Sequence, residues 1–300
     1  MNQASEFKRN ELILPEGFTT ENDHHIEYAK VTYHTTGQLN EEKDNVVWIC
    51  HALTANSDPG EWWSDFFKEN PMFSSGDHFI VCVNIPGSCY GSFGPLDLGN
   101  GEALYHDFPH TSIRDIVKCL RMVANEIGIK KIAYLIGASM GGQQALEWAI
   151  EEPDRIEKLV LLATNAKHSA WGIAFNESQR WAIETDPTWN ERDPNAGLNG
   201  MKVARSFALL SYRTYTGFHL TQDDQYQYNE QRKAESYQRY QGEKLAERFN
   251  AFSYYILSKA MDSHDVSRDR KSLEDALKCI KADTLVLNLQ GDLLFPLEDQ

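Results

Sequence analysis

The fold of this chain is decided by the stretch from Leu135 to Trp148, which reads Leu-Ile-Gly-Ala-Ser-Met-Gly-Gly-Gln-Gln-Ala-Leu-Glu-Trp. The apolar run 132–136 leads into Gly-x-Ser-x-Gly at 137–141, and a helical pattern of apolar residues follows. Strand, Gly-x-Ser-x-Gly and helix in this order indicate a nucleophile elbow, in which a strained turn projects the serine hydroxyl above a sheet. The ordinary alternative is a glycine-rich turn with an idle serine. The flanking strand and helix favour Ser139 as the nucleophile.

The composition of the 300-residue chain is that of a globular enzyme, with 41% hydrophobic and 24% charged residues. Its formal net charge of -15 argues against nucleic acid or an anionic membrane as the main partner. The N-terminal residues contain no apolar signal-peptide segment, and no apolar run approaches the ~18 residues of a membrane span. We therefore expect a cytoplasmic protein.

The five cysteines are an odd number without a Cys-x-x-Cys pair, and the sequence shows no zinc spacing. Cys50 and Cys82 lie in apolar strand runs, which predicts buried, reduced thiols. Cys89 lies in a glycine-rich loop, where packing is favoured over chemistry. We expect no metal and no tightly bound cofactor.

Apolar runs of strand length recur along the chain between segments of helical periodicity. Buried strands are expected at 46–50, 79–84, 132–136, 158–163 and 284–289. Residues 26–35 alternate in the manner of an exposed strand, and a helix is expected to follow an N-cap at Thr111. Buried strands joined by helical crossovers predict an α/β fold, with a mostly parallel sheet and helices on both faces.

Between about 165 and 264 strand runs vanish, and aromatic, glutamine, arginine and glutamate residues recur with helical spacing. We therefore divide the chain into a sheet core at 1–165, a helical lid insertion at 166–265 and a continuation of the core at 266–300. In open α/β sheets ligands bind outside the carboxyl ends of the strands. Ser139 and Asp292 both follow such ends.

A serine nucleophile needs a base that is oriented by a carboxylate, and in folds with this elbow the acid and then the histidine follow the serine. Asp292, after the run 284–289, is the predicted acid. The competing interpretation is a turn aspartate before a helix that Pro296 opens. The backbone N–H groups of Met140 and Leu53 are the predicted oxyanion hole.

With these residues assigned, the chain resembles the homoserine O-acetyltransferase family, which has the α/β-hydrolase fold. In the core the resemblance rests on HALT at 51–54, GSFGP at 91–95, DFP at 107–109, GASMGG at 137–142, QALEWA at 144–149 and DLLFP at 292–296. In the lid it rests on IAFNE at 173–177, on 236–244 and on KAMDSHD at 259–265. It covers nearly the whole chain and is far more specific than the elbow alone.

The resemblance implies that an acetyl group passes from acetyl-CoA, a cosubstrate, to the γ-hydroxyl of L-homoserine through an acyl-serine, in methionine biosynthesis. By match to the family, Arg205 binds the carboxylate of the acceptor and Tyr212 belongs to the same pocket. A guanidinium suits a carboxylate through paired hydrogen bonds, whereas a surface ion pair is the ordinary alternative for Arg205. The family also implies a homodimer.

All ten histidines precede Asp292, so we expect the triad histidine, and an aspartate for the acceptor's amino group, beyond residue 300. His264 is the best internal substitute, followed by His51. Phe93 and Ala138 stand where the family usually has threonine and glycine, so a succinyl donor stays open. A serine acceptor also stays open. A simple α/β-hydrolase esterase and a non-catalytic relative are the competing functions.

Overall fold

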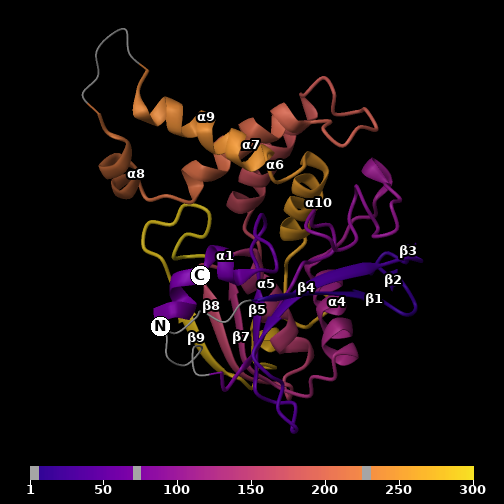
Figure 1. Ribbon diagram of the computed structural model, residues 1–300. Helices are drawn as coiled ribbons and strands as arrows, with labels where there is room; N and C mark the ends of the chain where they lie inside the picture. The colour runs from indigo at the N-terminus through magenta and orange to yellow at the C-terminus, as the bar shows by residue number, and fades with distance from the viewer. Residues whose placement is uncertain (1–6, 70–75, 225–230) are drawn as a thin grey trace.

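A computed structural model describes residues 7–69, 76–224 and 231–300 of the chain (Figure 1). Its main sheet has seven strands in the order β1-β4-β6-β5-β7-β8-β9. The strands are β1 (Lys8–Ile13), β4 (Lys30–Thr36), β5 (Val46–Cys50), β6 (Phe79–Val83), β7 (Ile132–Ala138), β8 (Ile156–Leu162) and β9 (Asp283–Leu287). β1 and β4 pair antiparallel, as do β4 and β6, and every later pair is parallel. The predicted α/β fold with a mostly parallel sheet is confirmed.

The strand predicted at 26–35 differs from the structure in position and environment. Its first residue belongs to a short hairpin of β2 (Phe18–Thr19) and β3 (His25–Ile26), and β4 begins only at Lys30. β4 lies between β1 and β6, and Val31 and Thr32 are fully buried. The prediction of an exposed strand was wrong because β4 is an interior strand of the sheet, and the larger core covers Val31.

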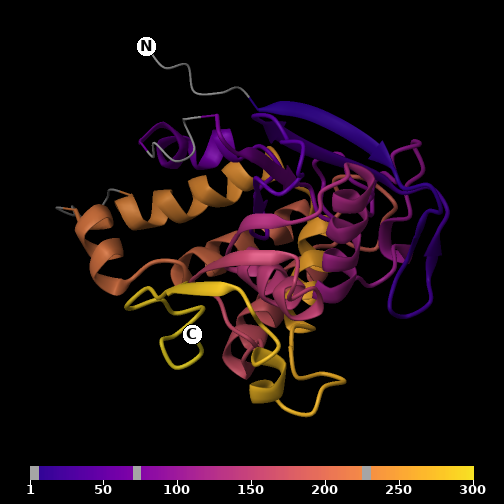
Figure 2. The ribbon, with the colours of Figure 1, turned by 90° about the horizontal axis from the view of Figure 1, so that it is seen from below.

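Side chains that alternate along the strands build two cores, one on each face of the sheet. Along β5, Trp48 packs into the larger core, whereas Val47 and Ile49 face the smaller one. α5 (Met140–Glu151) packs on β7 and β8, and α4 (Ile113–Glu126) packs on α5. Phe67 of α2 (Ser64–Glu69), next to the single turn α1 (Pro59–Trp62), contributes to the smaller core. Figure 2 shows β9 at the edge of the sheet opposite the N-terminal strands.

The N-cap of α4 is Ser112, one residue after the predicted Thr111. The Ser112 hydroxyl accepts a hydrogen bond from the backbone N–H of Asp115, and the Asp115 carboxylate accepts one from the backbone N–H of Ser112. This reciprocal capping box satisfies two N–H groups that the helix itself leaves unpaired. Serine and threonine are both good N-cap residues, so residue type alone does not choose between Thr111 and Ser112. Only Ser112 has an acidic residue, Asp115, three positions later, and this residue completes the capping box. Gly128, with φ of 78°, follows the helix as predicted.

The helical character predicted between β8 and β9 is confirmed, although the boundary at 166–265 stays a prediction. The helices there are α6 (Ala170–Glu184), α7 (Leu198–Ser211), α8 (Tyr215–Gln222), α9 (Lys233–Ala246), α10 (Ala251–Asp262) and α11 (Leu273–Leu277). Figure 1 shows α6 to α10 gathered above the sheet, and we call these five helices the lid. A 3-10 turn at Tyr105–Asp107 precedes α4. Within the described residues no helix is long and apolar enough to span a membrane.

Candidate active site

Ser139 lies between the end of β7 and the start of α5 with φ of 55° and ψ of -126°, a backbone conformation that L-residues rarely adopt. The turn is also crowded: a Cβ on Gly141 would lie 2.0 Å from the carbonyl oxygen of Cys50, and one on Gly137 would lie 2.1 Å from the carbonyl oxygen of Gly141. The glycines at both positions are therefore a steric requirement. The structure bears out the strained elbow geometry, with Ser139 partly exposed at the N-terminus of α5.

A cavity of about 230 Å³ lies directly over this serine. Nine residues from both core and lid line it: Ala52, Leu53, Thr54, Ser139, Ala163, Tyr212, Asp292, Leu294 and Phe295. The cavity thus brings together Ser139, Asp292, Leu53 and Tyr212, which lie far apart in the sequence. The crossover topology accounts for this, since parallel strands deliver their loops to one edge of the sheet.

Asp292 lies in the loop after β9 and uses one carboxylate oxygen to hold that loop. Its Oδ1 accepts hydrogen bonds of 2.9 Å from the backbone N–H groups of Leu294 and Phe295. Burial raises the pKa of Asp292, although these two hydrogen bonds oppose the shift. Within the described residues Oδ2 has no hydrogen-bond partner. Asp292 therefore makes the turn contacts of the competing interpretation while its second oxygen stays available to a base.

The lid holds the Asp292 loop from outside. The indole N–H of Trp171 on α6 donates to the carbonyl oxygen of Leu293, and the backbone N–H of Leu293 donates to the carbonyl oxygen of Ser211 at the end of α7. The position of the predicted acid thus depends on the lid as well as on the sheet.

The two residues of the predicted oxyanion hole, Met140 and Leu53, are close to Ser139. Met140, fully buried, is the first residue of α5, and the backbone N–H groups of a helix's first turn have no partner within the helix. Leu53 lines the cavity from the loop after β5. Over residues 7–69, 76–224 and 231–300, neither N–H has a hydrogen-bond acceptor. Both donors are therefore available to a developing oxyanion.

Arg205 lies one layer behind the cavity rather than in its lining. Its guanidinium carbon is 5.5 Å from the centre of the Tyr212 ring, and Tyr212 itself lines the cavity. No carboxylate in the described part of the chain lies within 4.0 Å of Arg205, and its buried Nε has no hydrogen-bond partner there. The surface ion pair considered for Arg205 is thus absent from the described residues.

Neither internal histidine considered as a substitute base is in the cavity lining. His51 is fully buried: its Nδ1 contacts the carbonyl oxygen of Ala52, and its Nε2 accepts from the backbone N–H of Ile85. The Nε2 of His264 contacts the carbonyl oxygen of Asn165 at 3.0 Å. Burial lowers the pKa of His51 to about 4 and that of His264 to about 3. Both rings have structural roles.

Other residues that the sequence singled out lie outside the cavity lining. Phe93 is fully buried and packs against Phe18, with ring centres 5.2 Å apart, so its replacement of threonine fills the core. Ala138 belongs to β7 and does not line the cavity either. Cys50 and Cys82 are buried free thiols, as predicted. The Sγ of Cys89 lies 3.7 Å from the carbonyl oxygen of Arg248, away from Ser139.

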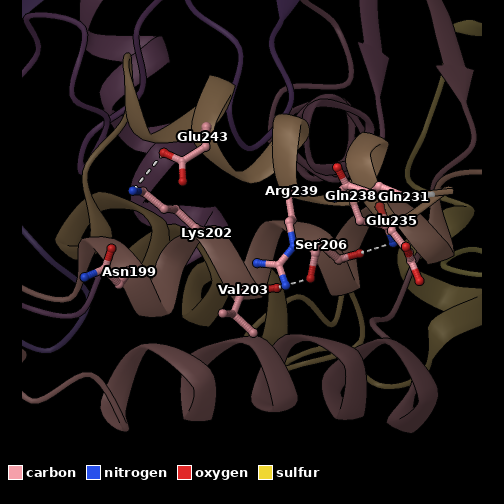
Figure 3. Close-up of a pocket in the computed structure, with 9 residues that line it drawn as sticks. All are labelled: Asn199, Lys202, Val203, Ser206, Gln231, Glu235, Gln238, Arg239 and Glu243. Carbon is pink, nitrogen blue, oxygen red and sulfur yellow. Dashed lines mark hydrogen bonds and ion pairs between the residues drawn. The ribbon is translucent and has the colours of Figure 1, made fainter. Parts of the chain in front are cut away.

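A larger cavity, of about 700 Å³, lies between α7 and α9 (Figure 3). Most of the residues that line it are polar, and they include a 2.8 Å ion pair between Lys202 and Glu243 and a hydrogen bond from Gln238 to the carbonyl oxygen of Ser206. Ser139 and Asp292 do not line it. Size alone therefore does not identify the active site.

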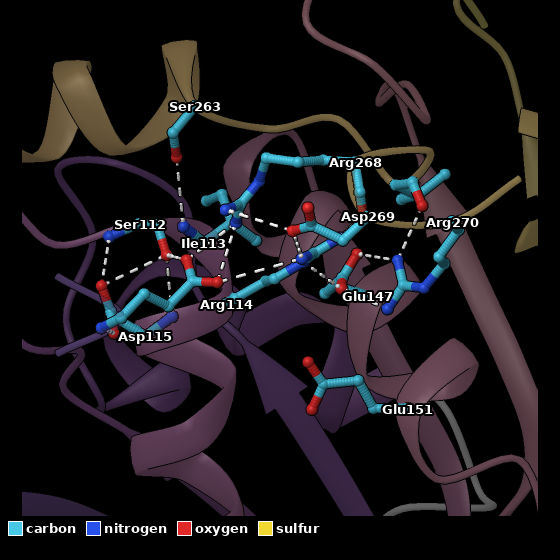
Figure 4. A network of polar contacts seen from close by, with 12 residues as sticks. Ser112, Ile113, Arg114, Asp115, Glu147, Glu151, Ser263, Arg268, Asp269 and Arg270 are labelled. Atoms are coloured by element: carbon cyan, nitrogen blue, oxygen red, sulfur yellow. Dashed lines mark hydrogen bonds and ion pairs between the residues drawn. The ribbon is translucent and has the colours of Figure 1, made fainter. Parts of the chain in front are cut away.

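The helix that follows Ser139 is fixed at its far end by buried ion pairs (Figure 4). Glu147 of α5, 1% exposed, accepts from Arg114 of α4 at 2.8 Å and from Arg270 at 2.6 Å. Arg268 binds Glu21 in the same network. The segment after the lid is thus tied to both α4 and α5, which anchors the lid's return to the core. In the part of the chain described, no three metal-ligating side chains gather to hold an ion.

The chain matches a family model described as the alpha/beta hydrolase fold over residues 45–300, and it therefore belongs to the α/β-hydrolase class of proteins. Its curated relatives narrow this class. It is 46% identical over 272 residues to the homoserine O-acetyltransferase of Cyclobacterium marinum, covering 90% of this chain and 78% of that protein. The chain belongs to the homoserine O-acetyltransferase family and is an enzyme of the acyltransferase class.

Two further comparisons agree. The homoserine O-acetyltransferase of Chloroherpeton thalassium is 42% identical over 276 residues, covering 90% of this chain and 73% of that protein. The crystal structure of homoserine O-acetyltransferase from Staphylococcus aureus superposes with a TM-score of 0.80 at 27% identity, covering 98% of this chain and 83% of that one. The resemblance drawn from the sequence motifs is confirmed.

Proposed function

We propose that this protein moves an acetyl group from acetyl-CoA to the γ-hydroxyl of L-homoserine, in methionine biosynthesis, through an acetylated Ser139. The observation that carries the proposal is the small cavity in which a strained serine and a tyrosine backed by an arginine meet two amides, with no partner for the amides or the guanidinium Nε among the described residues. Membership of the homoserine O-acetyltransferase family supports the same reaction.

In the first half-reaction the Ser139 oxygen attacks the thioester carbonyl and CoA leaves as the thiol. The serine proton ends on the CoA sulfur, and the role assigned to Asp292 is to orient the base that carries it. The carbonyl oxygen becomes negative in the tetrahedral intermediate, where the N–H groups of Leu53 and Met140 stabilise it. Their lack of other acceptors among the described residues means that they need not break a bond to do so.

In the second half-reaction the homoserine hydroxyl attacks the acetyl-serine, and its proton returns to the Ser139 oxygen. Arg205, without a carboxylate partner among the described residues, is the cation available for the carboxylate of homoserine. This requires the guanidinium to reach past the edge of Tyr212. Water would give ester hydrolysis at the same step, so the outcome depends on how well the amino acid is held.

Acetyl is favoured over succinyl by the charge of the cavity. Among the described residues, its lining includes the Asp292 carboxylate and no lysine, arginine or histidine. A succinyl group would bring a second carboxylate next to Asp292, and burial of unpaired like charges is costly.

Mass spectrometry of the intact and digested protein after mixing with acetyl-CoA or succinyl-CoA tests this proposal. The expected result is an acetyl group on Ser139 and its release on addition of homoserine as O-acetylhomoserine. A succinyl adduct would contradict acetyl-CoA as the donor, and an adduct on another residue would contradict Ser139 as the nucleophile. Equal release of the acetyl group without homoserine would contradict homoserine as the acceptor.

We also propose a cytoplasmic homodimer. Several large apolar side chains of the lid helices are exposed: Trp171, Trp181, Val203, Phe207, Leu210, Leu220 and Tyr240. Apolar patches of this kind are typical of protein interfaces. Analytical ultracentrifugation at micromolar concentration should give the mass of two chains, and a single-chain mass would contradict the dimer.

A further inference from the structure

The predicted oxyanion donor Leu53 lies in a short turn at 52–55, directly after β5. The backbone N–H of Ala55 donates to the carbonyl oxygen of Ala52 at 3.0 Å, which closes the turn. Leu53 and Thr54 are its two central residues, and both line the cavity of about 230 Å³. Oxyanion donors are effective because they are held in place before the reaction. The contacts that fix this turn are therefore relevant to catalysis.

The core holds the first half of this turn. The Nδ1 of His51 contacts the carbonyl oxygen of Ala52 at 2.9 Å, and the Nε2 of Gln144 on α5 donates to the carbonyl oxygen of His51 at 3.2 Å. The side chains of His51 and Gln144 are fully buried. In the second half of the turn, the carbonyl oxygen of Thr54 accepts one hydrogen bond from within the described residues, and its donor comes from between two lid helices.

This donor is Arg248, in the link between α9 and α10. Its Nη1 donates to the carbonyl oxygen of Thr54 at 2.6 Å and also to the hydroxyl oxygen of Tyr90. Hydrogen bonds from a charged donor are roughly twice as strong as those between neutral groups. One guanidinium nitrogen thus joins the turn at 52–55 to the glycine-rich loop that follows β6.

The backbone on both sides of this contact is anchored in the core. Phe249, the residue after Arg248, is 4% exposed, and its ring centre lies 5.8 Å from that of Tyr90. The carbonyl oxygen of Tyr90 accepts from Nδ2 of Asn84, and Oδ1 of Asn84 accepts from the backbone N–H of Ser57. Asn84 is 1% exposed and lies directly after β6. Both loops therefore share one buried anchor, and Arg248 ties them together from the lid.

We propose that Arg248 is a positioning residue, which holds the turn at 52–55 so that the N–H of Leu53 stays directed at the oxyanion. This rests on the proposed function, in which an oxyanion forms in both half-reactions. Loss of Arg248 should therefore slow both half-reactions, whereas loss of Arg205 should slow only the transfer to homoserine. Nothing in the sequence pattern marks Arg248, because its side chain is exposed and its partner is a backbone carbonyl of a distant loop.

Rapid-mixing measurement of Ser139 acetylation, with acetyl-CoA and with p-nitrophenyl acetate, tests the positioning role. Arg248→Met keeps most of the length of the side chain and removes its donors. It should lower the acetylation rate constant at saturation about tenfold to hundredfold with either acyl donor, because small displacements of an oxyanion donor are costly. The apparent dissociation constant of each acyl donor should stay within about twofold of the unmodified protein's. Transfer of the acetyl group to homoserine should slow by a similar factor.

Arg192→Met is the matched control. Arg192, between α6 and α7, also ties the lid to the core, through the Asp107 carboxylate and the carbonyl oxygen of Leu104, but none of these residues lines the cavity. Its loss should change the acetylation rate constant by less than about twofold, as surface substitutions usually do. Equal rate constants for Arg248→Met and Arg192→Met would overturn the proposal.

A conservative variant separates positioning from a general effect on the fold. Because a single nitrogen of Arg248 makes both contacts, a lysine ammonium with its three donors can replace it. Arg248→Lys should therefore acetylate Ser139 at least about fivefold faster than Arg248→Met. Equal rate constants for these two variants, or a melting temperature of Arg248→Met well below that of Arg192→Met, would show that Arg248 has only a structural role.

The two acyl donors separate positioning from recognition of CoA. p-Nitrophenyl acetate has no phosphate, so a loss confined to acetyl-CoA would show that Arg248 binds the cosubstrate, which would overturn the positioning role. Acetylation of the unmodified protein by the aryl ester without transfer to homoserine would overturn the proposed function, while the aryl ester still reports on the turn. Absence of acetyl-Ser139 from the unmodified protein with both donors would overturn the nucleophile and the positioning role together.

Discussion

The hydroxyl of Thr164 donates a hydrogen bond of 2.8 Å to the carbonyl oxygen of Ser139. The backbone N–H groups of Gly142 and Gln143 donate to the same oxygen at 2.9 and 3.2 Å. The segment after β8 therefore helps to hold Ser139, at the end of the neighbouring strand, in its strained conformation. A strained backbone conformation persists only where the surrounding contacts hold it. Here three hydrogen-bond donors hold the carbonyl group of Ser139 in place.

The first prediction concerns Ser139 itself. Ser139→Ala should abolish acyl labelling and lower turnover by at least about a thousandfold, since the members of a catalytic triad act as a unit. Ser139→Gly should be equally inactive but more stable than Ser139→Ala by about 1 kcal/mol, because glycine adopts a positive φ without strain. Urea unfolding of the two inactive variants measures the difference. Alanine as the more stable residue would contradict the strain assigned to this turn.

Gly141 should tolerate no side chain. A Cβ there would lie 2.0 Å from the carbonyl oxygen of Cys50, a backbone atom that cannot move aside. Gly141→Ala should therefore lower the free energy of unfolding by about 3 kcal/mol or prevent folding, as overpacking of a rigid site does. The control is Gly217→Ala on α8, where, among the described residues, a Cβ would meet only the Thr214 hydroxyl oxygen at 3.0 Å. Equal melting temperatures for Gly141→Ala and Gly217→Ala would contradict this explanation.

Replacement of Arg205 should affect one half-reaction. Arg205→Ala should weaken transition-state binding of homoserine by about 2–5 kcal/mol if the ion pair with the substrate is desolvated, while acetylation of Ser139 by acetyl-CoA proceeds. Arg213→Ala is the control, because Arg213 donates to the Tyr237 hydroxyl and packs on its ring. Single-turnover measurement of each half-reaction checks this. Equal losses in both would show that Arg205 is structural.

Glu147 should be among the most sensitive carboxylates for stability. Glu147→Ala leaves Arg114 and Arg270 without their shared buried partner, and loss of one member of such a cluster costs about 3–5 kcal/mol. Glu157→Ala serves as the control, since Glu157 lies 4.0 Å from Lys131 in an exposed pair. Exposed pairs contribute less than about 1 kcal/mol. Denaturant unfolding of both variants decides whether burial sets the difference.

Two buried histidines should make the protein acid-sensitive. The pKa values of about 4 for His51 and about 3 for His264 lie below the ~6.5 of an unfolded chain. Below that pH the unfolded chain binds protons that the folded chain does not, so the free energy of unfolding falls as pH drops toward those lower values. Each histidine adds a slope of up to about 1.4 kcal/mol per pH unit.

Unfolding measured between about pH 7 and about pH 4.5 should show this slope. His264→Gln keeps a donor for the carbonyl oxygen of Asn165 and should reduce it. His219→Gln, at an exposed histidine of α8, should leave it unchanged. Identical slopes in the two variants would mean that His264 takes up no proton on unfolding.

The sequence by itself determined the parallel part of the sheet, the elbow and the family. Periods of two and 3.6 residues report which segments are strands and helices, and Gly137-x-Ser139-x-Gly141 is required by the steric limits of one turn, so both are local properties. Asp292 could be assigned for the same reason, since its place after a strand run puts it at the edge where Ser139 lies.

The tertiary structure alone decided what surrounds each of these residues. It placed β4 between β1 and β6 with Val31 and Thr32 buried, placed Phe93 in the core, and set Arg205 behind Tyr212 rather than in the cavity lining. Tyr254 and Gln179 are 75 residues apart and meet only because α6 and α10 pack together. Hydrogen-bond direction and burial depend on contacts between distant segments, and no local pattern in the chain encodes them.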